Sequence, residues 1–309
     1  MNTPVNCFGR LWLGCLLLLP ADQTSAQSQQ RDPATSVNVQ APSESSDNDR
    51  ASLVKSVSLT ATRIQGGGDD ELGISDITVR ASIFAPTSLE SIPFLIFSPG
   101  FGVRLLDAPA AIGLPNELYS TSLTASWMHD WSERTKLAIG LTGGIYSDFE
   151  ATDGAFRITG HAFSTTQLND CWEMMLGVVA LNQSDIPVLP MAGVVYKPDA
   201  DTRIELTAPR PRFAKRVSWL DDSEDANDWA YVSGEFGGGT YAVKRPGGAE
   251  DQVNFRDFRL LIGFESKTSS GIKTLFEAGY VFGRNIEFED DSTEFKPSDT
   301  AIFRAGLSF

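Results

Sequence analysis

Apolar and polar residues alternate along most of this chain in short runs. Over 77–83 and again over 301–309 the apolar residues occupy the odd positions, and over 258–264 they occupy the even ones. Side chains of a β-strand point alternately to its two faces, so this period of two predicts strands with one apolar face. From Leu53 onward no segment of ten or more residues has the 3.6-residue period of an amphipathic helix. The pattern predicts an all-β domain.

About fourteen strands are predicted, each close to the length that a tilted membrane strand needs. They are expected near 53–64, 74–84, 93–106, 117–128, 135–147, 155–167, 171–182, 187–197, 202–209, 212–219, 229–243, 253–267, 271–284 and 300–309. An even number of strands places the N-terminal and C-terminal ends of the barrel on the same side of the membrane. The turns on that side are then mostly short and those on the other side mostly longer, which is the asymmetry of an antiparallel transmembrane β-barrel.

Three features fit this count poorly. Residues 208–211 would have to form a tight turn between two short strands, and 220–228 is long for a connection on the short-turn side. If either assignment is wrong, the barrel has twelve strands. Pro187 and Pro190 also weaken the eighth strand, because proline cannot donate to a strand ladder.

The two ends of the chain indicate secretion and insertion into an outer membrane. Residues 1–26 have a basic residue, a short apolar run and small residues before Gln27, as in a cleaved signal peptide. Residues 27–52 are rich in Ser, Gln, Asp and Pro and are expected to be a disordered periplasmic linker. The barrel is expected over 53–309. Its last residue, Phe309, resembles the terminal aromatic signal that the barrel-assembly machinery reads.

Composition narrows the partners. Hydrophobic residues make up 41% of the chain and the net charge is −15. A membrane barrel hides its apolar residues at every second position, so this hydropathy is compatible with a membrane protein. The negative charge argues against nucleic acid. Acidic stretches such as 221–225 are expected to be solvated loops, with binding of a divalent cation as the alternative.

A periplasmic β-sandwich would also alternate, with its apolar face buried. The opposite face of these strands is dense in Gly, Ser and Thr and carries mixed charges, which is typical of a water-lined lumen. Parity places a set of ionisable side chains there, and either they select polar solutes or they pair across a closed lumen. They are Arg80, Arg104, Lys136, Arg157, His161, Glu173, Arg203, Glu205, Arg216, Glu235, Asp257, Arg259, Glu265, Glu277 and Arg304.

No catalytic, cofactor or metal site is predicted. After the signal peptide the chain has two histidines, His129 and His161, and it has no Gly-x-Ser-x-Gly elbow. Neither glycine run, 66–68 or 237–239, continues as a phosphate loop. The second run is expected to let a strand bend sharply or to leave room in the lumen.

Several stretches together resemble an uncharacterised family of bacterial outer-membrane-like proteins that carries a domain-of-unknown-function label. They are 97–102, 208–213, 234–241, 256–259, 277–284 and 305–309. The resemblance covers 53–309 and implies no activity or site residue. Residues 190–206 are also similar, more weakly, to segments of putative outer-membrane transporters.

The sequence leaves the function open among three classes. The first is an outer-membrane channel for small polar solutes, in contact with outer-membrane lipid and with the assembly machinery during biogenesis. The second is a non-conducting barrel with a structural or partner-binding role. The third, a lipid-modifying enzyme, is disfavoured by the two poorly placed histidines.

Overall fold

The computed structural model describes residues 54–66, 71–89, 92–182, 187–217, 227–290 and 294–309. The predicted signal peptide and linker, 1–26 and 27–52, lie outside these residues, as does most of the connection 220–228. The described part of the chain contains no helix long and apolar enough to cross a membrane.

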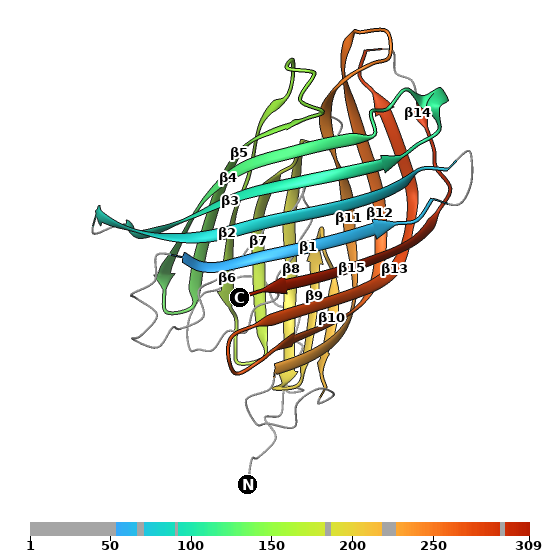
Figure 1. Ribbon diagram of the computed structural model, residues 1–309. Helices are drawn as coiled ribbons and strands as arrows, with labels where there is room; N and C mark the ends of the chain where they lie inside the picture. Colours follow the sequence, from blue (N-terminus) through green and yellow to red (C-terminus); the bar gives the residue numbers. More distant parts are fainter. Residues whose placement is uncertain (1–53, 67–70, 90–91, 183–186, 218–226, 291–293) are drawn as a thin grey trace.

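Fourteen strands form one closed antiparallel barrel, which confirms the predicted all-β class and rules out twelve strands (Figure 1). Each strand pairs with its neighbour in sequence, and β1 closes the ring against β15. A short strand of two residues, β14, pairs with β13, and a 3-10 turn, η2, follows β3. The bounds are β1 Val54–Ile64, β2 Gly73–Leu89, β3 Ile92–Asp107, η2 Ala110–Ile112, β4 Glu117–Ser132, β5 Thr135–Ser147, β6 Phe156–Gln167, β7 Trp172–Ala180, β8 Val188–Asp199, β9 Thr202–Ala208, β10 Arg212–Arg216, β11 Asn227–Lys244, β12 Glu250–Lys267, β13 Lys273–Phe288, β14 Glu294–Phe295 and β15 Thr300–Ser308.

The seam is closed by the last residues of the chain. Ser58 pairs with Ser308 and Ile64 with Ile302 across β1 and β15. Two further hydrogen bonds, of 2.7 and 3.0 Å, join the backbones of Val57 and Phe309. The barrel end that holds Phe309 is called the C-terminal end below.

The outward side chains form an apolar band. Leu141 on β5, Ile158 on β6, Leu206 on β9 and Ile262 on β12 are all more than half exposed. Aromatic side chains mark the C-terminal end of the band, where Trp172 stacks on Tyr196 with ring centroids 4.4 Å apart. An exposed apolar surface around a whole barrel is what a strand wall facing lipid requires.

The wall is not uniform, because β9 and β10 have seven and five residues and β11 has 18. β10 pairs with β11 only as far as Ser233. Beyond that level β11 bends at Gly238 and Gly239, with φ of 129° and 141°, and Ala242 pairs in parallel with Ser147 of β5. Such φ values favour glycine, so the run 237–239 does bend the strand. Opposite the C-terminal end, the ring is therefore closed by β5 and β11, without β6–β10.

The poorly fitting prolines lie where this wall changes. The turn 208–211, with a cis Ala208–Pro209 bond, ends the short β9–β10 hairpin. On β8 the backbone N–H and C=O groups of the odd-numbered residues point toward β7. The Lys197 N–H donates to the Cys171 carbonyl, and the Pro187 carbonyl accepts from the Leu181 N–H. Pro190 therefore faces the β9 side, at a level that β9, whose pairing with β8 begins at Ala192, does not reach. A proline there leaves no unmade donor.

Two apolar clusters fill parts of the interior. The first, called the apolar collar, lies toward the end opposite the C-terminal end. The second, called the apolar stripe, runs along β5–β8. The collar comprises Ile64, Leu72, Ile74, Leu106, Leu118, Tyr146, Tyr241, Val243, Val253, Phe255, Leu261, Val281, Ile286, Phe288 and Ile302. The stripe comprises Ala138, Phe163, Val179, Leu181 and Met191, with Met128, Met175, Leu189 and Phe236 packed against them.

Candidate functional site

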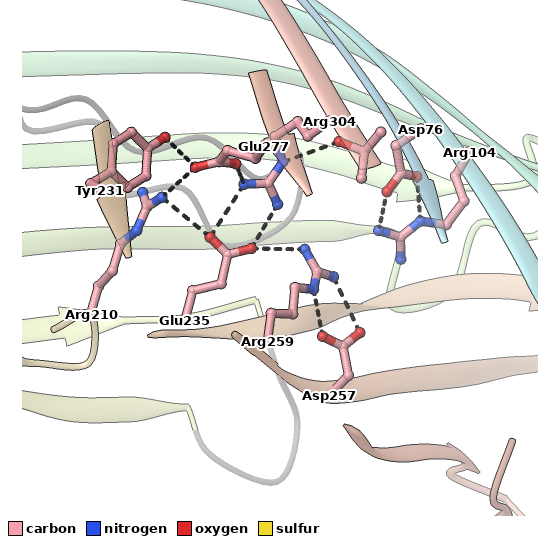
Figure 2. Close-up of polar contacts among 10 residues, drawn as sticks. Asp76, Arg104, Arg210, Tyr231, Glu235, Asp257, Arg259, Glu277 and Arg304 are labelled. Carbon is pink, nitrogen blue, oxygen red and sulfur yellow. Dashed lines mark hydrogen bonds and ion pairs between the residues drawn. The ribbon is translucent and has the colours of Figure 1, made fainter. Parts of the chain in front are cut away.

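A layer of buried charges lies in the lumen next to the apolar collar, on the side formed by β11, β12, β13 and β15. Arg304 lies two positions from the collar residue Ile302 on β15, so the two levels are about 7 Å apart. Figure 2 shows the side chains converging from different walls of the barrel. This ion-pair layer comprises Arg210, Tyr231, Glu235, Asp257, Arg259, Glu277 and Arg304.

Arg304 is the centre of the layer. Its guanidinium donates to Glu277 Oε2 at 2.5 Å and to Glu235 Oε1 at 2.6 Å. Its Nε donates to Thr62 Oγ1 at 3.2 Å. Glu277 and Thr62 are its direct cross-strand partners on β13 and β1, whereas Glu235 reaches it from β11. One side chain thus ties both neighbours of the last strand to a more distant wall.

Arg259 forms the second node. It donates to Asp257 at 2.6 Å and to Glu235 Oε1 at 3.1 Å. Asp257 is two positions away on β12, on the same face. A Cβ added to Gly237 would lie 2.4 Å from the Arg259 guanidinium carbon, which is closer than atoms pack. The glycine run therefore also leaves room in the lumen.

Arg210 enters the layer from the tip of the β9–β10 hairpin. Its guanidinium lies 3.3 Å from Glu277 Oε1 and 3.5 Å from Glu235 Oε2. Tyr231 donates to the same Glu277 oxygen at 2.5 Å. The short hairpin is what brings Arg210 to this level, because a full-length β9 and β10 would carry the turn well past it.

The layer is neutral and dry. It holds three arginines and three carboxylates, and the exposed fractions of Arg259, Glu235 and Arg304 are 2%, 4% and 3%. Charges this deeply buried are stable only when they are paired and hydrogen-bonded. A second buried pair, Asp76 and Arg104 at 2.7 Å, packs against the collar, since the Arg104 guanidinium lies 5.2 Å from the ring centroids of Tyr241 and Phe255.

The C-terminal half of the lumen is wetter. Lys197 pairs with Glu173 at 2.5 Å, and both side chains are 17–18% exposed. Arg203 and Glu205 pair at 2.5 Å, and Arg212 lies 2.8 Å from Glu265. Exposure of the charged groups therefore falls from this end toward the ion-pair layer.

Five of the predicted lumen residues belong neither to the layer nor to the pairs described above. Lys136 is exposed, with Asp130 at 3.9 Å, and Arg157 donates to Gln252. Arg80 is partly buried on β2. His161 packs 5.6 Å from the Phe163 ring, in the space left by Gly140. Arg216, also predicted, lies 3.5 Å from Asp201 near the C-terminal end.

The sequence interpretation missed several participants, among them Lys197, which pairs with Glu173. Asp76, Arg212 and Tyr231 share the faces of Arg80, Arg216 and Glu235, so the parity that placed those residues would have placed them too. Arg210 is in a turn, where parity gives no direction. Only the structure assigns it to the lumen.

Other chemistry has little support in the described residues. They contain no group of three or more His, Cys, Asp or Glu that could hold a metal ion. His129 stacks on Trp127 with centroids 5.3 Å apart, whereas His161 packs against Phe163 on β6. The acidic stretch 221–225 lies outside the described residues. That the chain has no enzymatic activity stays a prediction.

Three comparisons place the chain among known proteins. The model of a family described as a domain of unknown function, DUF6268, matches residues 108–305. No curated protein matches. Among solved structures, the chain is similar to a KdgM porin (10% identity, 82% of this chain and 98% of that one, TM-score 0.36) and to a bacterial polysaccharide outer-membrane secretin (10%, 82% and 97%, 0.41). It is also similar to the β-domain of the Bordetella autotransporter BrkA (12%, 82% and 97%, 0.35). These TM-scores are too low to carry an argument about function.

Proposed function

As the chain belongs to the DUF6268 family, whose function is unknown, we propose from its own geometry that it is an outer-membrane β-barrel closed to polar solutes. The observation that carries this proposal is the ion-pair layer, buried directly against the apolar collar. It favours the non-conducting alternative over an open diffusion pore.

The membrane assignment rests on the outer face of the wall. A closed ring of strands has no edge, so its backbone groups are satisfied without water. The apolar band and the aromatic Trp172 and Tyr196 near one end suit a bilayer and its interface. The exposed C-terminal Phe309 supports recognition by the assembly machinery at the periplasmic side.

Closure follows from energetics. An ion that crosses the layer must separate buried partners, and removing one partner of a buried pair costs about 3–5 kcal/mol. The collar adds a second barrier, since an unpaired charge among apolar side chains costs more than a paired one. We expect negligible conductance in this conformation.

A gated channel for small polar solutes is the second candidate. Its support is the polar C-terminal half of the lumen, where the Glu173–Lys197 and Arg203–Glu205 pairs keep contact with water. Opening would require the ion-pair layer to exchange partners and the collar to move aside.

Single-channel recording of the full-length protein in planar bilayers tests the proposal. We expect no steady current from the wild type. Glu235→Gln with Glu277→Gln leaves the arginines without two partners, and we expect rare openings from this variant. A control, Asp201→Asn, removes a carboxylate near the C-terminal end and should stay silent. Steady current in the wild type would refute a closed barrel and favour a channel.

A further inference from the structure

The lumen has an apolar side and a charged side. The apolar stripe and the side chains packed against it come mostly from β4–β8, with Phe236 added from β11. The charged pairs of the C-terminal half come from β7–β10 and β12, and they are Lys197 with Glu173, Arg203 with Glu205, and Arg212 with Glu265. A solute in this half of the lumen therefore meets apolar atoms on one side and charged groups on the other.

Part of the apolar side is left open to the lumen. Met128 and Met175 pack against the stripe but are only partly buried. Met128 is the direct cross-strand partner of Ala138, a member of the stripe, and Met175 shares a face of β7 with Val179, another member. Methionine side chains are flexible and adapt to different apolar partners. This surface therefore suits a flexible alkyl chain.

The apolar and charged sides meet on β7. Glu173 and Met175 are successive residues on its lumen face, about 7 Å apart, and Val179 lies about 13 Å beyond Met175. Across β8, Val195 pairs with both Glu173 and Glu205, so Glu205 of β9 lies beside the same boundary. A ligand with a charged head and a short alkyl chain can contact both sides at once.

The charged side holds buried donors that have no hydrogen-bond acceptor among the described residues. They are Nη1 of Arg203, Nε of Arg212 and the hydroxyl of Ser233. Arg212 is the direct cross-strand partner of both Glu205 and Ser233, and Arg203 lies two positions from Glu205. Glu205 and Glu265 contact other nitrogen atoms of the two guanidinium groups. Because an unmade hydrogen bond of a buried donor costs free energy, these three neighbouring groups favour an anion.

The donors can be reached from the C-terminal end. The side chains of Arg203 and Glu265 are 17% and 24% exposed, and that of Arg216, four positions beyond Arg212 on β10, is 40% exposed. On the other side lie the ion-pair layer and the apolar collar, which are buried. A ligand therefore enters and leaves at the C-terminal end.

We propose that the C-terminal half of the lumen binds an amphipathic carboxylate, namely a medium-chain fatty acid such as decanoate. The carboxylate accepts hydrogen bonds from Arg203, Arg212 and Ser233. The alkyl chain lies over Met175 and Met128, along the apolar stripe. An inorganic anion would leave the apolar surface bare, and an uncharged alkane would leave the donors without an acceptor. The inference rests on the proposed membrane location and does not require the barrel to conduct.

The methionines of the chain provide a test with an internal control. Apart from Met1, they are Met128, Met174, Met175 and Met191. Three of them belong to the apolar stripe or pack against it, whereas Met174 lies on the outward face of β7. A ligand in the lumen and a ligand dissolved in the bilayer therefore affect different methyl groups.

Methyl NMR reads out this difference. The full-length protein, with carbon-13 in its methionine methyl groups, is inserted into phosphatidylcholine nanodiscs and titrated with decanoate. We expect shifts at Met128, Met175 and Met191 that saturate, and at Met174 only a change that rises linearly with decanoate. From hexanoate to decanoate the affinity should rise about threefold to fourfold for each CH₂ group. The uncharged methyl decanoate should bind about tenfold more weakly.

Arginine variants test the site of the carboxylate. Arg203→Gln and Arg212→Gln should each weaken decanoate binding about tenfold, and Arg203→Lys should restore part of the loss. The control Arg216→Gln changes a lumen arginine closer to the C-terminal end and should have no effect. All variants are first checked for heat-modifiable mobility on gels. If the buried Arg212 variant does not fold, the partly exposed Arg203 and the methyl ester still decide the question.

The outcomes are distinct. Linear changes at all four methionines in the inserted protein would overturn the site and leave the membrane location intact. Failure of the folded protein to insert into nanodiscs would refute the membrane location and the site with it. Methyl decanoate that binds as tightly as decanoate would refute the role of the arginines. Inorganic phosphate that displaces decanoate at equal concentration would refute the role of the apolar stripe.

Discussion

Glu235 should be the most sensitive carboxylate in the barrel. It lies within hydrogen-bond or ion-pair distance of three arginines, at 2.6 Å from Arg304, 3.1 Å from Arg259 and 3.5 Å from Arg210. Glu235→Gln preserves the shape and leaves excess positive charge in a buried layer. Breaking a buried pair by removing one partner costs about 3–5 kcal/mol, and we expect a loss of that size in the free energy of unfolding.

The assay is urea unfolding of the full-length protein in vesicles, followed by tryptophan fluorescence. Asp201→Asn is the matched control, because Asp201 is 62% exposed beside Arg216, and an exposed pair contributes at most about 1 kcal/mol. A loss for Glu235→Gln no larger than that of the control would refute the reasoning that the layer is dry.

A double variant sharpens the same test. Glu235→Gln with Arg304→Gln leaves two arginines and two carboxylates, so the layer is neutral again. The double variant should then lose less stability than the sum of the two single changes, since residues in one network couple. Strict additivity would mean that the two side chains contribute independently and would contradict the geometry of Figure 2.

Two further predictions follow from other contacts. Gly237→Ala would put a Cβ 2.4 Å from the Arg259 guanidinium and should destabilise by about 1–3 kcal/mol in the same unfolding assay, whereas Gly247→Ala, with open space around it, should change little. Glu250 lies near the tip of the β11–β12 hairpin, where its carboxylate accepts hydrogen bonds from the backbone N–H groups of Asp153 and Thr152, and these lower its pKa below 4.5. The contact is therefore present while the carboxylate is ionised and is lost as the pH falls through the lowered pKa. Hydrogen exchange at Thr152 and Asp153, corrected for the intrinsic rate, should accelerate in acid and be fast at all pH values in Glu250→Gln; an unchanged rate would contradict the contact.

The strands were predictable because a barrel wall imposes a local rule. Each residue faces either lipid or lumen, so a period of two appears in the sequence itself. The predicted strands at 135–147 and 202–209 differ from β5 and β9 by one residue at most. The bend at 237–239 was also expected, because three glycines in a strand have few other uses.

The pairing of lumen charges was not predictable, because parity gives the face and not the partner. Glu277 and Arg304 are direct neighbours on β13 and β15, and knowing this requires the register. Glu235 on β11 and Arg304 on β15 have β12 and β13 between them, so their contact requires the curvature of the wall as well. The position of Arg210 in the lumen depends on the short β9–β10 hairpin. In the sequence, this hairpin was visible only as a turn at 208–211 that fitted the predicted strands badly.

The prolines that fit the predicted strands badly lie where β9 and β10 are short. A wall in which every strand spans the membrane needs a donor at each ladder position, so proline at 190, 209 and 211 conflicts with a uniform barrel. In the structure Pro190 lies on β8 before the level at which β8 begins to pair with β9, and Pro209 and Pro211 lie in the turn that ends the β9–β10 hairpin. The departure from the pattern therefore marks the part of the wall that differs in shape, and the cation that this part brings into the lumen, Arg210, is the one with the weakest partners.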